Sequence, residues 1–160
     1  MTETEIDYYE GRNRKNFGRD TESDYITGTT EGLTNRADVT MTSRTDTSKT
    51  YLGETKDYTI SGFQRPHNIY ENYQIDYEKI KYLYLEALKE KRIPFLYVRF
   101  TDETFIWVIT PELFNKLLST VRCVPVNKYG LDYGKEKEFA EQVYFDFSDA
   151  VRHYKTRYYE

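Results

Sequence analysis

The chain has 160 residues, of which 38% are hydrophobic and 31% charged, a balance that is ordinary for a globular protein and excludes wholesale disorder. This length predicts a single domain, residues 1–160, with enough apolar material for a core. The 23 basic and 27 acidic residues give a net charge of −4, so no overall electrostatic field attracts the protein to nucleic acid.

The sequence contains one cysteine, Cys123, which excludes a disulfide framework and a cysteine-based zinc site. Because Cys123 lies in the apolar, strand-like run 120–124, we expect a buried structural thiol rather than a nucleophile. No apolar run approaches the length of a membrane-spanning helix, and the polar, acidic N-terminus argues against a signal peptide. We therefore expect a cytoplasmic protein that makes no membrane contact.

The first predicted element is a helix over residues 2–17. Thr2 and Glu5 have the spacing of a capping box, in which two side chains satisfy backbone groups at the start of a helix. Gly18 follows, and glycine often ends a helix. The stretch 11–19 holds four basic residues and no acid, so it is also a candidate for contact with phosphates.

Three strands are expected next. Residues 23–29 form a short strand candidate. Residues 33–43 alternate between hydrophobic and polar side chains, which predicts a half-buried strand with Asp38 on its polar face. After a polar loop, residues 51–60 form a further strand that ends at a Ser-Gly pair.

The clearest helix covers residues 76–91, after a predicted loop over 63–72. Its apolar residues recur at helical spacing on one face, and charged residues lie outside that face. The predicted apolar stripe consists of Ile80, Leu83, Tyr84, Ala87 and Leu88.

A hairpin is expected after this helix. Residues 93–100 and 104–109 are apolar runs joined by a short polar turn, so we expect two strands that are buried on both faces. Thr110 then caps a short helix with a proline in its first turn, and this helix runs to about residue 119.

The end of the chain, from about residue 120 to 160, adds further elements to this core. Residues 121–126 and 138–147 are strand candidates, separated by a loop that contains glycine. A final helix is expected to be capped by Ser148 or Asp149. The order of helices and strands is typical of an α/β or α+β fold.

A candidate catalytic group lies at Glu54-Thr55-Lys56. Residues two apart on a strand point to the same face, so the Glu54 carboxylate and the Lys56 ammonium project side by side. Asp38 lies on the polar face of the strand expected next to them. Two carboxylates can share a hard cation such as Mg²⁺, which activates water and offsets phosphate charge, while a lysine positions the water. These residues are the minimum needed for phosphodiester hydrolysis.

Other interpretations of these residues stay open. An acid-x-Lys triplet is a weak signal by itself, because such a pair often faces solvent and Asp38 can be an unrelated surface acid. Asp46 lies in the polar loop after the strand that carries Asp38, and it is a less favoured candidate than Asp38 for the metal ligand. His67 and His153 lack neighbouring ligands at set spacing, so a histidine–metal nuclease is not expected.

The order of these motifs resembles the PD-(D/E)XK nuclease superfamily, which has the restriction-endonuclease-like fold. Arg36-Ala37-Asp38-Val39 matches its Asp element, although Ala37 stands where a proline is preferred. Gly53-Glu54-Thr55-Lys56 matches its Glu-x-Lys element, and the helix through 77–83 follows as in that pattern.

The strand pair 94–102 and 105–108 is similar to that of small phage-type members of the superfamily. The resemblance covers about residues 2–109, within a predicted core of 2–119. It implies a central mixed sheet of about five strands flanked by helices, with residues 120–160 as a strand–helix addition.

The resemblance also implies an activity, that of a metal-dependent endonuclease hydrolysing phosphodiester bonds in DNA. Asp38, Glu54 and Lys56 would be its catalytic residues. Asp38 and Glu54 would hold Mg²⁺ or Mn²⁺, and Lys56 would orient the attacking water.

Further site residues are implied by the same resemblance. Many members add a glutamate from the first helix, for which Glu10 is the best candidate and Glu5 the next. Small phage-type members often add a lysine or glutamine from the second helix, where Lys79 and Lys81 are the candidates.

The expected partner is DNA, and a homodimer would let two sites cut two strands. The basic C-terminal stretch 152–157 is a second candidate for phosphate contact. A rival interpretation is a non-catalytic binding or structural protein that retains the fold, as part of a phage particle or as an interaction module. Backbone contacts are expected from Arg12, Arg14, Lys15 and Arg19.

Overall fold

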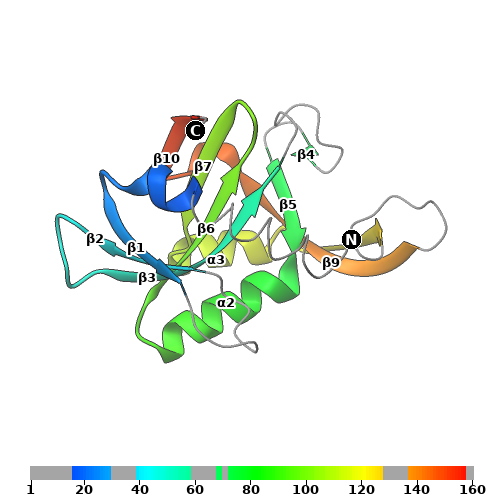
Figure 1. Cartoon of the computed structure of the whole chain (residues 1–160). Helices are drawn as coiled ribbons and strands as arrows, with labels where there is room; N and C mark the ends of the chain where they lie inside the picture. Colours follow the sequence, from blue (N-terminus) through cyan, green and yellow to red (C-terminus); the bar gives the residue numbers. More distant parts are fainter. Residues whose placement is uncertain (1–15, 30–38, 59–67, 70–71, 128–136, 158–160) are drawn as a thin grey trace.

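The computed structural model describes residues 16–29, 39–58, 68–69, 72–127 and 137–157. These residues form two β-sheets with helices packed against them, a mixed α+β architecture (Figure 1). The helical and strand segments follow one another along the chain broadly as the hydrophobic patterns predict.

The larger sheet contains six strands, which lie side by side in the order β1 (Tyr25–Thr29), β2 (Val39–Ser43), β3 (Thr50–Asp57), β6 (Ile93–Arg99), β7 (Glu103–Val108) and β10 (Arg152–Lys155). β3 and β6 run parallel, whereas the other neighbouring strands are antiparallel, so the sheet is mixed as expected. The sequence predicts about five strands, and the sixth is β10, which the sequence does not predict.

The smaller sheet contains four strands in the order β4 (Asn68–Ile69), β5 (Asn72–Asp76), β9 (Lys137–Asp146) and β8 (Arg122–Asn127). All of its strand pairs are antiparallel. β8 and β9 match the two strands expected near the C-terminus. β5 is a strand where no strand is predicted, and it buries Tyr73 and Ile75 on one face.

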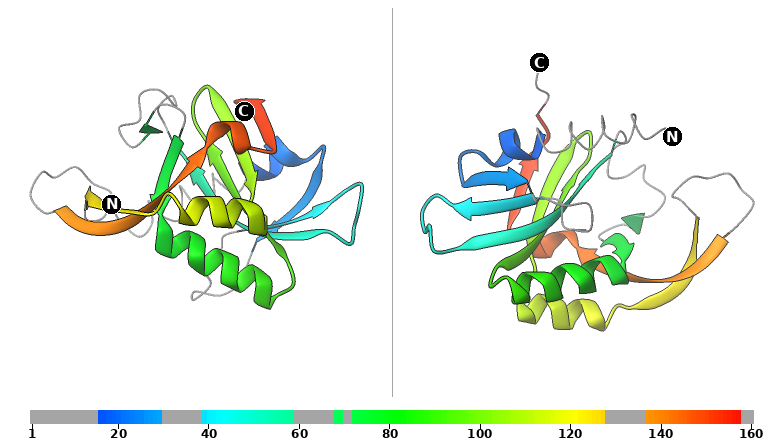
Figure 2. Two further views of the ribbon diagram at one scale, coloured as in Figure 1. Left: turned by 180° about the vertical axis from the view of Figure 1, so that it is seen from behind. Right: turned by 60° about the horizontal axis from the view of Figure 1, so that its bottom comes forward.

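Two helices, α2 (Tyr77–Lys89) and α3 (Pro111–Leu118), lie next to each other on one side of the larger sheet (Figure 2). The rings of Tyr84 and Phe114 stack between them, with centroids 4.0 Å apart. Thr110 caps α3 as predicted, because its side chain accepts a hydrogen bond from the backbone N–H of Leu113 over 3.1 Å. In the described part of the chain, no helix has the length and hydrophobicity needed to cross a membrane.

Each face of the larger sheet is covered by its own hydrophobic core. On one face, Leu52 and Val98 pack with buried residues of α2, α3 and the smaller sheet. On the other face, Tyr51 and Phe95 pack with Phe17 of the helical segment 16–21. The central strands β3 and β6 are therefore buried on both sides. Because successive side chains of a strand point to opposite faces, alternate residues of each strand contribute to different cores.

The predicted apolar stripe of α2 is confirmed for Ile80, Leu83 and Ala87, which are buried. Tyr84 is partly buried against the same core. The expectation for Leu88 is wrong, because 56% of this residue is exposed. Leu88 lies in the last turn, at the edge of the stripe, and no described element covers it.

Three expectations outside the sheet core are wrong. Cys123 is exposed rather than buried, because it lies on the edge strand β8. The expected final helix is a 3-10 turn, Phe147–Asp149, capped by Asp146 and followed by β10. Gly18 does not end a helix but lies inside the helical segment 16–21, while the rest of the helix predicted over 2–17 lies outside the described residues. A side chain at Gly18 would press on Thr27, so this glycine lets the helical segment approach β1 closely.

Candidate active site

β3 presents two different faces, and Glu54 and Lys56 lie on the same one. The side chains of Leu52, Glu54 and Lys56 share one face of β3, because alternate residues of a strand point to the same side. This is the face that α2 covers, since Leu52 packs in the same hydrophobic core as Ile80 and Leu83 of α2. Their partners on the parallel strand β6 are Pro94, Leu96 and Val98. The predicted polar pair therefore emerges from a row of buried apolar residues.

Glu54 and Lys56 form an ion pair. Lys56 Nζ lies 3.3 Å from Glu54 Oε1, and the two side chains are 27% and 14% exposed. Partial burial reduces screening by water, so each charge acts more strongly on the other than it would on an open surface. The pair remains accessible, which a site for a dissolved substrate requires.

Lys79 joins this pair from the first turn of α2. Its amine lies within hydrogen-bonding reach of Lys56 and also interacts with Glu54. Loss of hydration, followed by the charge of Lys56, lowers the pKa of Lys79. Loss of hydration also opposes the charge on Lys56, but Glu54 and the contact with Lys79 outweigh it and raise the pKa of Lys56. Lys56 is therefore the persistent cation of the group, and Lys79 releases its proton more readily.

Asp76 is a further acid near this group, and no sequence motif points to it. It precedes α2, and its charge favours the protonated form of Lys79. Its carboxylate does not cap the helix; instead Asp76 Oδ1 accepts a hydrogen bond of 2.5 Å from Nε2 of the buried Gln142 on β9. The smaller sheet thus fixes the acid that faces Lys79.

Three other predicted site residues lie in the described part of the chain, and they do not join this group. Lys81 is exposed on α2, and no contact between it and the group occurs among the described residues. Asp46 lies in the loop between β2 and β3, where its carboxylate accepts hydrogen bonds from Ser48, which lower its pKa. Arg19 is exposed on the helical segment 16–21. The predicted residues that lie outside the described ranges are Glu5, Glu10, Arg12, Arg14, Lys15, Asp38 and His67.

No cluster of metal-binding side chains surrounds Glu54 within the described ranges. In that part of the chain, no three His, Cys, Asp or Glu side chains gather closely enough to hold a metal ion. His153 Nε2 lies 3.0 Å from Glu103 Oε1, and its ring stacks on Phe105. Val39, the residue after Asp38, pairs with Gly53, the residue before Glu54.

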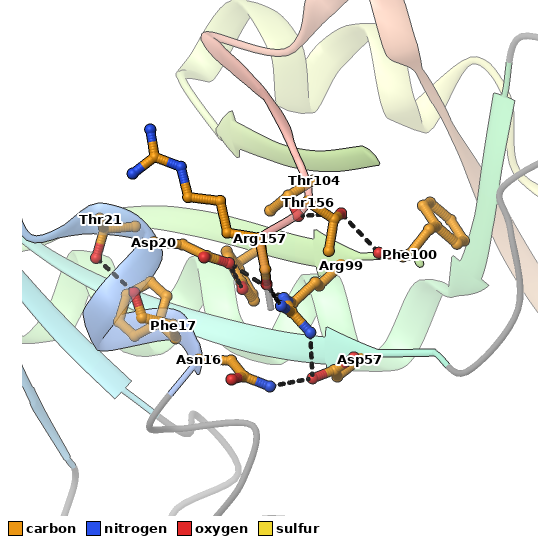
Figure 3. A network of polar contacts seen from close by, with 11 residues as sticks. Asn16, Phe17, Asp20, Thr21, Asp57, Arg99, Phe100, Thr104, Thr156 and Arg157 are labelled. Atoms are coloured by element: carbon orange, nitrogen blue, oxygen red, sulfur yellow. Dashed lines mark hydrogen bonds and ion pairs between the residues drawn. The ribbon is translucent and has the colours of Figure 1, made fainter. Parts of the chain in front are cut away.

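On the opposite face of the same strands, Arg99 lies between two carboxylates (Figure 3). Its Nε is 3.2 Å from Asp20 Oδ2, and its Nη1 is 3.8 Å from Asp57 Oδ2. Tyr97 donates a hydrogen bond of 2.6 Å to Asp20. Arg99 Nη2 also donates to the backbone carbonyl of Arg157. All three charged side chains are less than a tenth exposed.

This network fixes the end of β3, because Asp57 directly follows Lys56. Asn16 also donates a hydrogen bond of 3.1 Å to Asp57. The network therefore ties the helical segment 16–21, β3, β6 and the residues after β10 to one another. Sequence patterns do not reveal it, since its members are far apart along the chain.

Comparisons with known proteins place the fold. No family model matches the chain, and no curated protein sequence matches it. A solved structure that matches is Archaeoglobus fulgidus Hjc, a Holliday junction resolvase from an archaeal hyperthermophile, with a TM-score of 0.50 and 6% sequence identity over 86% of this chain and 93% of that chain. The described chain has the fold of that resolvase, which is the restriction-endonuclease-like fold implied by the sequence resemblance.

Proposed function

We propose that this protein is a divalent-metal-dependent endonuclease that hydrolyses phosphodiester bonds in DNA at a site centred on Glu54 and Lys56. The observation that carries the proposal is the partly buried ion pair of these two residues, with Lys79 beside it. The fold supports the proposal, since the similar solved structure is that of a Holliday junction resolvase.

Each residue of the site has a role in this proposal. Lys56 holds its proton, so its ammonium can stabilise negative charge that develops on a phosphate and can orient a water molecule. Glu54 holds Lys56 in place through the contact of 3.3 Å and offers an oxygen ligand. Lys79 adds a second amine beside the first, and Asp76 faces it from the start of α2.

The donor chemistry fits a hard cation such as Mg²⁺ or Mn²⁺, which prefers carboxylate oxygens. Glu54 would be one ligand. We propose Asp38 as the second, because it directly precedes Val39, whose partner on β3 is the residue next to Glu54. When bound, the cation would supply positive charge and Lewis acidity at the phosphate.

Incubation of supercoiled plasmid and of branched DNA with the full-length protein tests the activity. We expect cleavage with Mg²⁺ or Mn²⁺ and none with a chelator. Lys56→Ala should reduce the cleavage rate by about 100-fold or more, which is the typical cost of removing a group that stabilises developing charge. The matched control is Lys49→Ala, which removes an exposed lysine from the β2–β3 loop.

Two outcomes contradict the proposal. No cleavage of either DNA by the parent protein would favour a non-catalytic binding or structural protein with this fold. Metal-dependent cleavage that is equal in the parent and in Lys56→Ala would place the activity at another site.

The proposal includes a homodimer, since two copies would present two sites to the two strands of a duplex. It also places the protein in the cytoplasm. Sedimentation of the full-length chain with and without DNA measures the oligomeric state. A monomer under both conditions would remove the dimer from the proposal and would leave the site assignment intact.

A further inference from the structure

A pocket lies between the helical segment 16–21 and β10, away from Glu54. Its walls include Arg19 from the first segment and Lys155 and Arg157 from the end of the chain. These residues come from the two basic stretches that the sequence analysis identifies, 11–19 and 152–157. The fold thus brings together two cationic segments that are separated by most of the chain. Asp20, Glu22, Ser23 and Tyr154 complete the lining.

The charged and polar residues of β10 and of the segment that follows it divide into two groups. Arg152 Nε lies 3.5 Å from Asp24 Oδ2, and His153 Nε2 lies 3.0 Å from Glu103 Oε1. Tyr154 donates a hydrogen bond of 3.0 Å to Asp24. These three residues are used within the protein.

Lys155 and Arg157 form the second group. Both side chains are exposed, and neither has an ion-pair partner among the residues that the structure describes. In Figure 3 the guanidinium of Arg157 extends away from the buried network, while its backbone carbonyl accepts the hydrogen bond from Arg99. The backbone at Arg157 is therefore fixed, and its side chain is left for an external contact.

The acids of the pocket do not cancel this charge. Asp20 is held by the Arg99 guanidinium at 3.2 Å and by the Tyr97 hydroxyl at 2.6 Å, so its carboxylate is turned to partners inside the protein. Glu22 is the remaining acid of the lining. Lys155 and Arg157 outnumber it, and the pocket is locally positive in a protein whose net charge is −4.

We propose that this pocket binds phosphate groups of a DNA backbone and is a second contact for the substrate, separate from the catalytic group. This inference rests on the proposed function, which makes DNA the anion that the protein meets. Cationic side chains on a fixed backbone suit phosphates, which they position without reading sequence.

Polar contacts connect the pocket to the strand that carries the catalytic group. Arg99 connects the backbone of Arg157 to Asp57, which follows Lys56 and lies on the opposite face of β3. The backbone of Arg157 is therefore linked, through Arg99 and Asp57, to β3, the strand that carries Glu54 and Lys56.

The test compares DNA binding by the full-length parent, by Lys155→Ala/Arg157→Ala and by the matched control Lys49→Ala/Lys89→Ala, which removes two exposed lysines elsewhere. Fluorescence anisotropy with a labelled duplex, in a chelator so that no cleavage occurs, gives the affinity over roughly 50 to 200 mM salt. We expect the pocket variant to lose about tenfold in affinity and the slope of log affinity against log salt to fall by about two. The control should lose less than about twofold.

Each other result overturns the inference. Equal losses in the pocket variant and the control would mean that only total charge matters, and no loss in either would mean that the pocket does not touch DNA. The charge-preserving variant Lys155→Arg/Arg157→Lys should bind as the parent does. Failure of the proposed function is seen separately, as a parent protein that binds DNA through the pocket but never cleaves it.

Discussion

Lys56 and Lys79 lie within hydrogen-bonding reach of each other, although one belongs to β3 and the other to the first turn of α2. Two lysines this close repel each other when both are charged, and Glu54 offsets part of that repulsion. The arrangement places two amines and one carboxylate side by side, at the place where the proposed function has a phosphate react.

We therefore expect Lys79→Met to slow DNA cleavage by about 10- to 100-fold, because it removes one of two groups that can offset charge at the phosphate. Lys81→Met is the matched control on the same helix, and it should cleave within about twofold of the parent. Initial rates with saturating metal measure both. Equal losses in the two variants would contradict the role of Lys79.

Gly53 faces Phe95 across the parallel pair β3–β6, and a Cβ at this position would collide with the Phe95 ring. We expect Gly53→Ala to lower the free energy of unfolding by about 1–3 kcal/mol, the usual cost of overpacking a core. In the Phe95→Leu background the same change should cost less, because a smaller side chain leaves room for the methyl group. Urea denaturation of the four proteins measures the coupling, and equal costs in both backgrounds would contradict the collision.

Arg99 lies between the buried carboxylates of Asp20 and Asp57. Arg99→Leu should lower the free energy of unfolding by about 3–5 kcal/mol, because it leaves buried carboxylates without their guanidinium. The comparison is Arg152→Ala, which breaks a pair with Asp24 whose side chains are 47% and 37% exposed, and this should cost less than about 1 kcal/mol. Chemical denaturation of both variants tests the difference, and similar costs would contradict the structural role of the network.

Tyr97 provides a test at alkaline pH. Burial, followed by the charge of Asp20, raises the pKa of Tyr97 well above its ordinary value of 10.0. A raised folded-state pKa means that the contribution to stability is present below the unfolded pKa and is lost as pH rises above it. From about pH 10 upward, the parent should lose about 1.4 kcal/mol per pH unit more than Tyr97→Phe does. Identical slopes in urea unfolding at several alkaline pH values would contradict this assignment.

The sequence predicts the elements whose side-chain pattern is strong and local. Alternation over β2 and β3 places Val39 and Met41 in the core, and it places Glu54 and Lys56 together on one face. The α2 stripe and the Thr110 cap are confirmed for the same reason, since each depends on residues within a few positions of one another.

The elements that the sequence misses depend on distant partners. β5 is short and half polar, and it is a strand because Asn72 to Asp76 pairs with β9, far along the chain. The sequence predicts a helix where β10 lies, because Ser148 and Asp149 are residues that often cap a helix. Instead Asp146 caps a single 3-10 turn, and β10 pairs with β7.

The same limit applies to the site. Lys79 and Lys81 look equivalent in sequence, but residues two apart on a helix point in very different directions. Only the position of α2 against β3 decides that Lys79 reaches Lys56. Asp76 is likewise identified by its partners Lys79 and Gln142 rather than by a motif.

The catalytic role of Glu54 and Lys56 is tested by the rate of Mg²⁺-dependent DNA cleavage by the parent and by Glu54→Gln, which keeps the size of the side chain and removes its charge. We predict cleavage by the parent that a chelator abolishes, together with a loss of about 100-fold or more in Glu54→Gln at unchanged folding by circular dichroism. Cleavage by Glu54→Gln at the parental rate would contradict a catalytic site centred on Glu54 and Lys56.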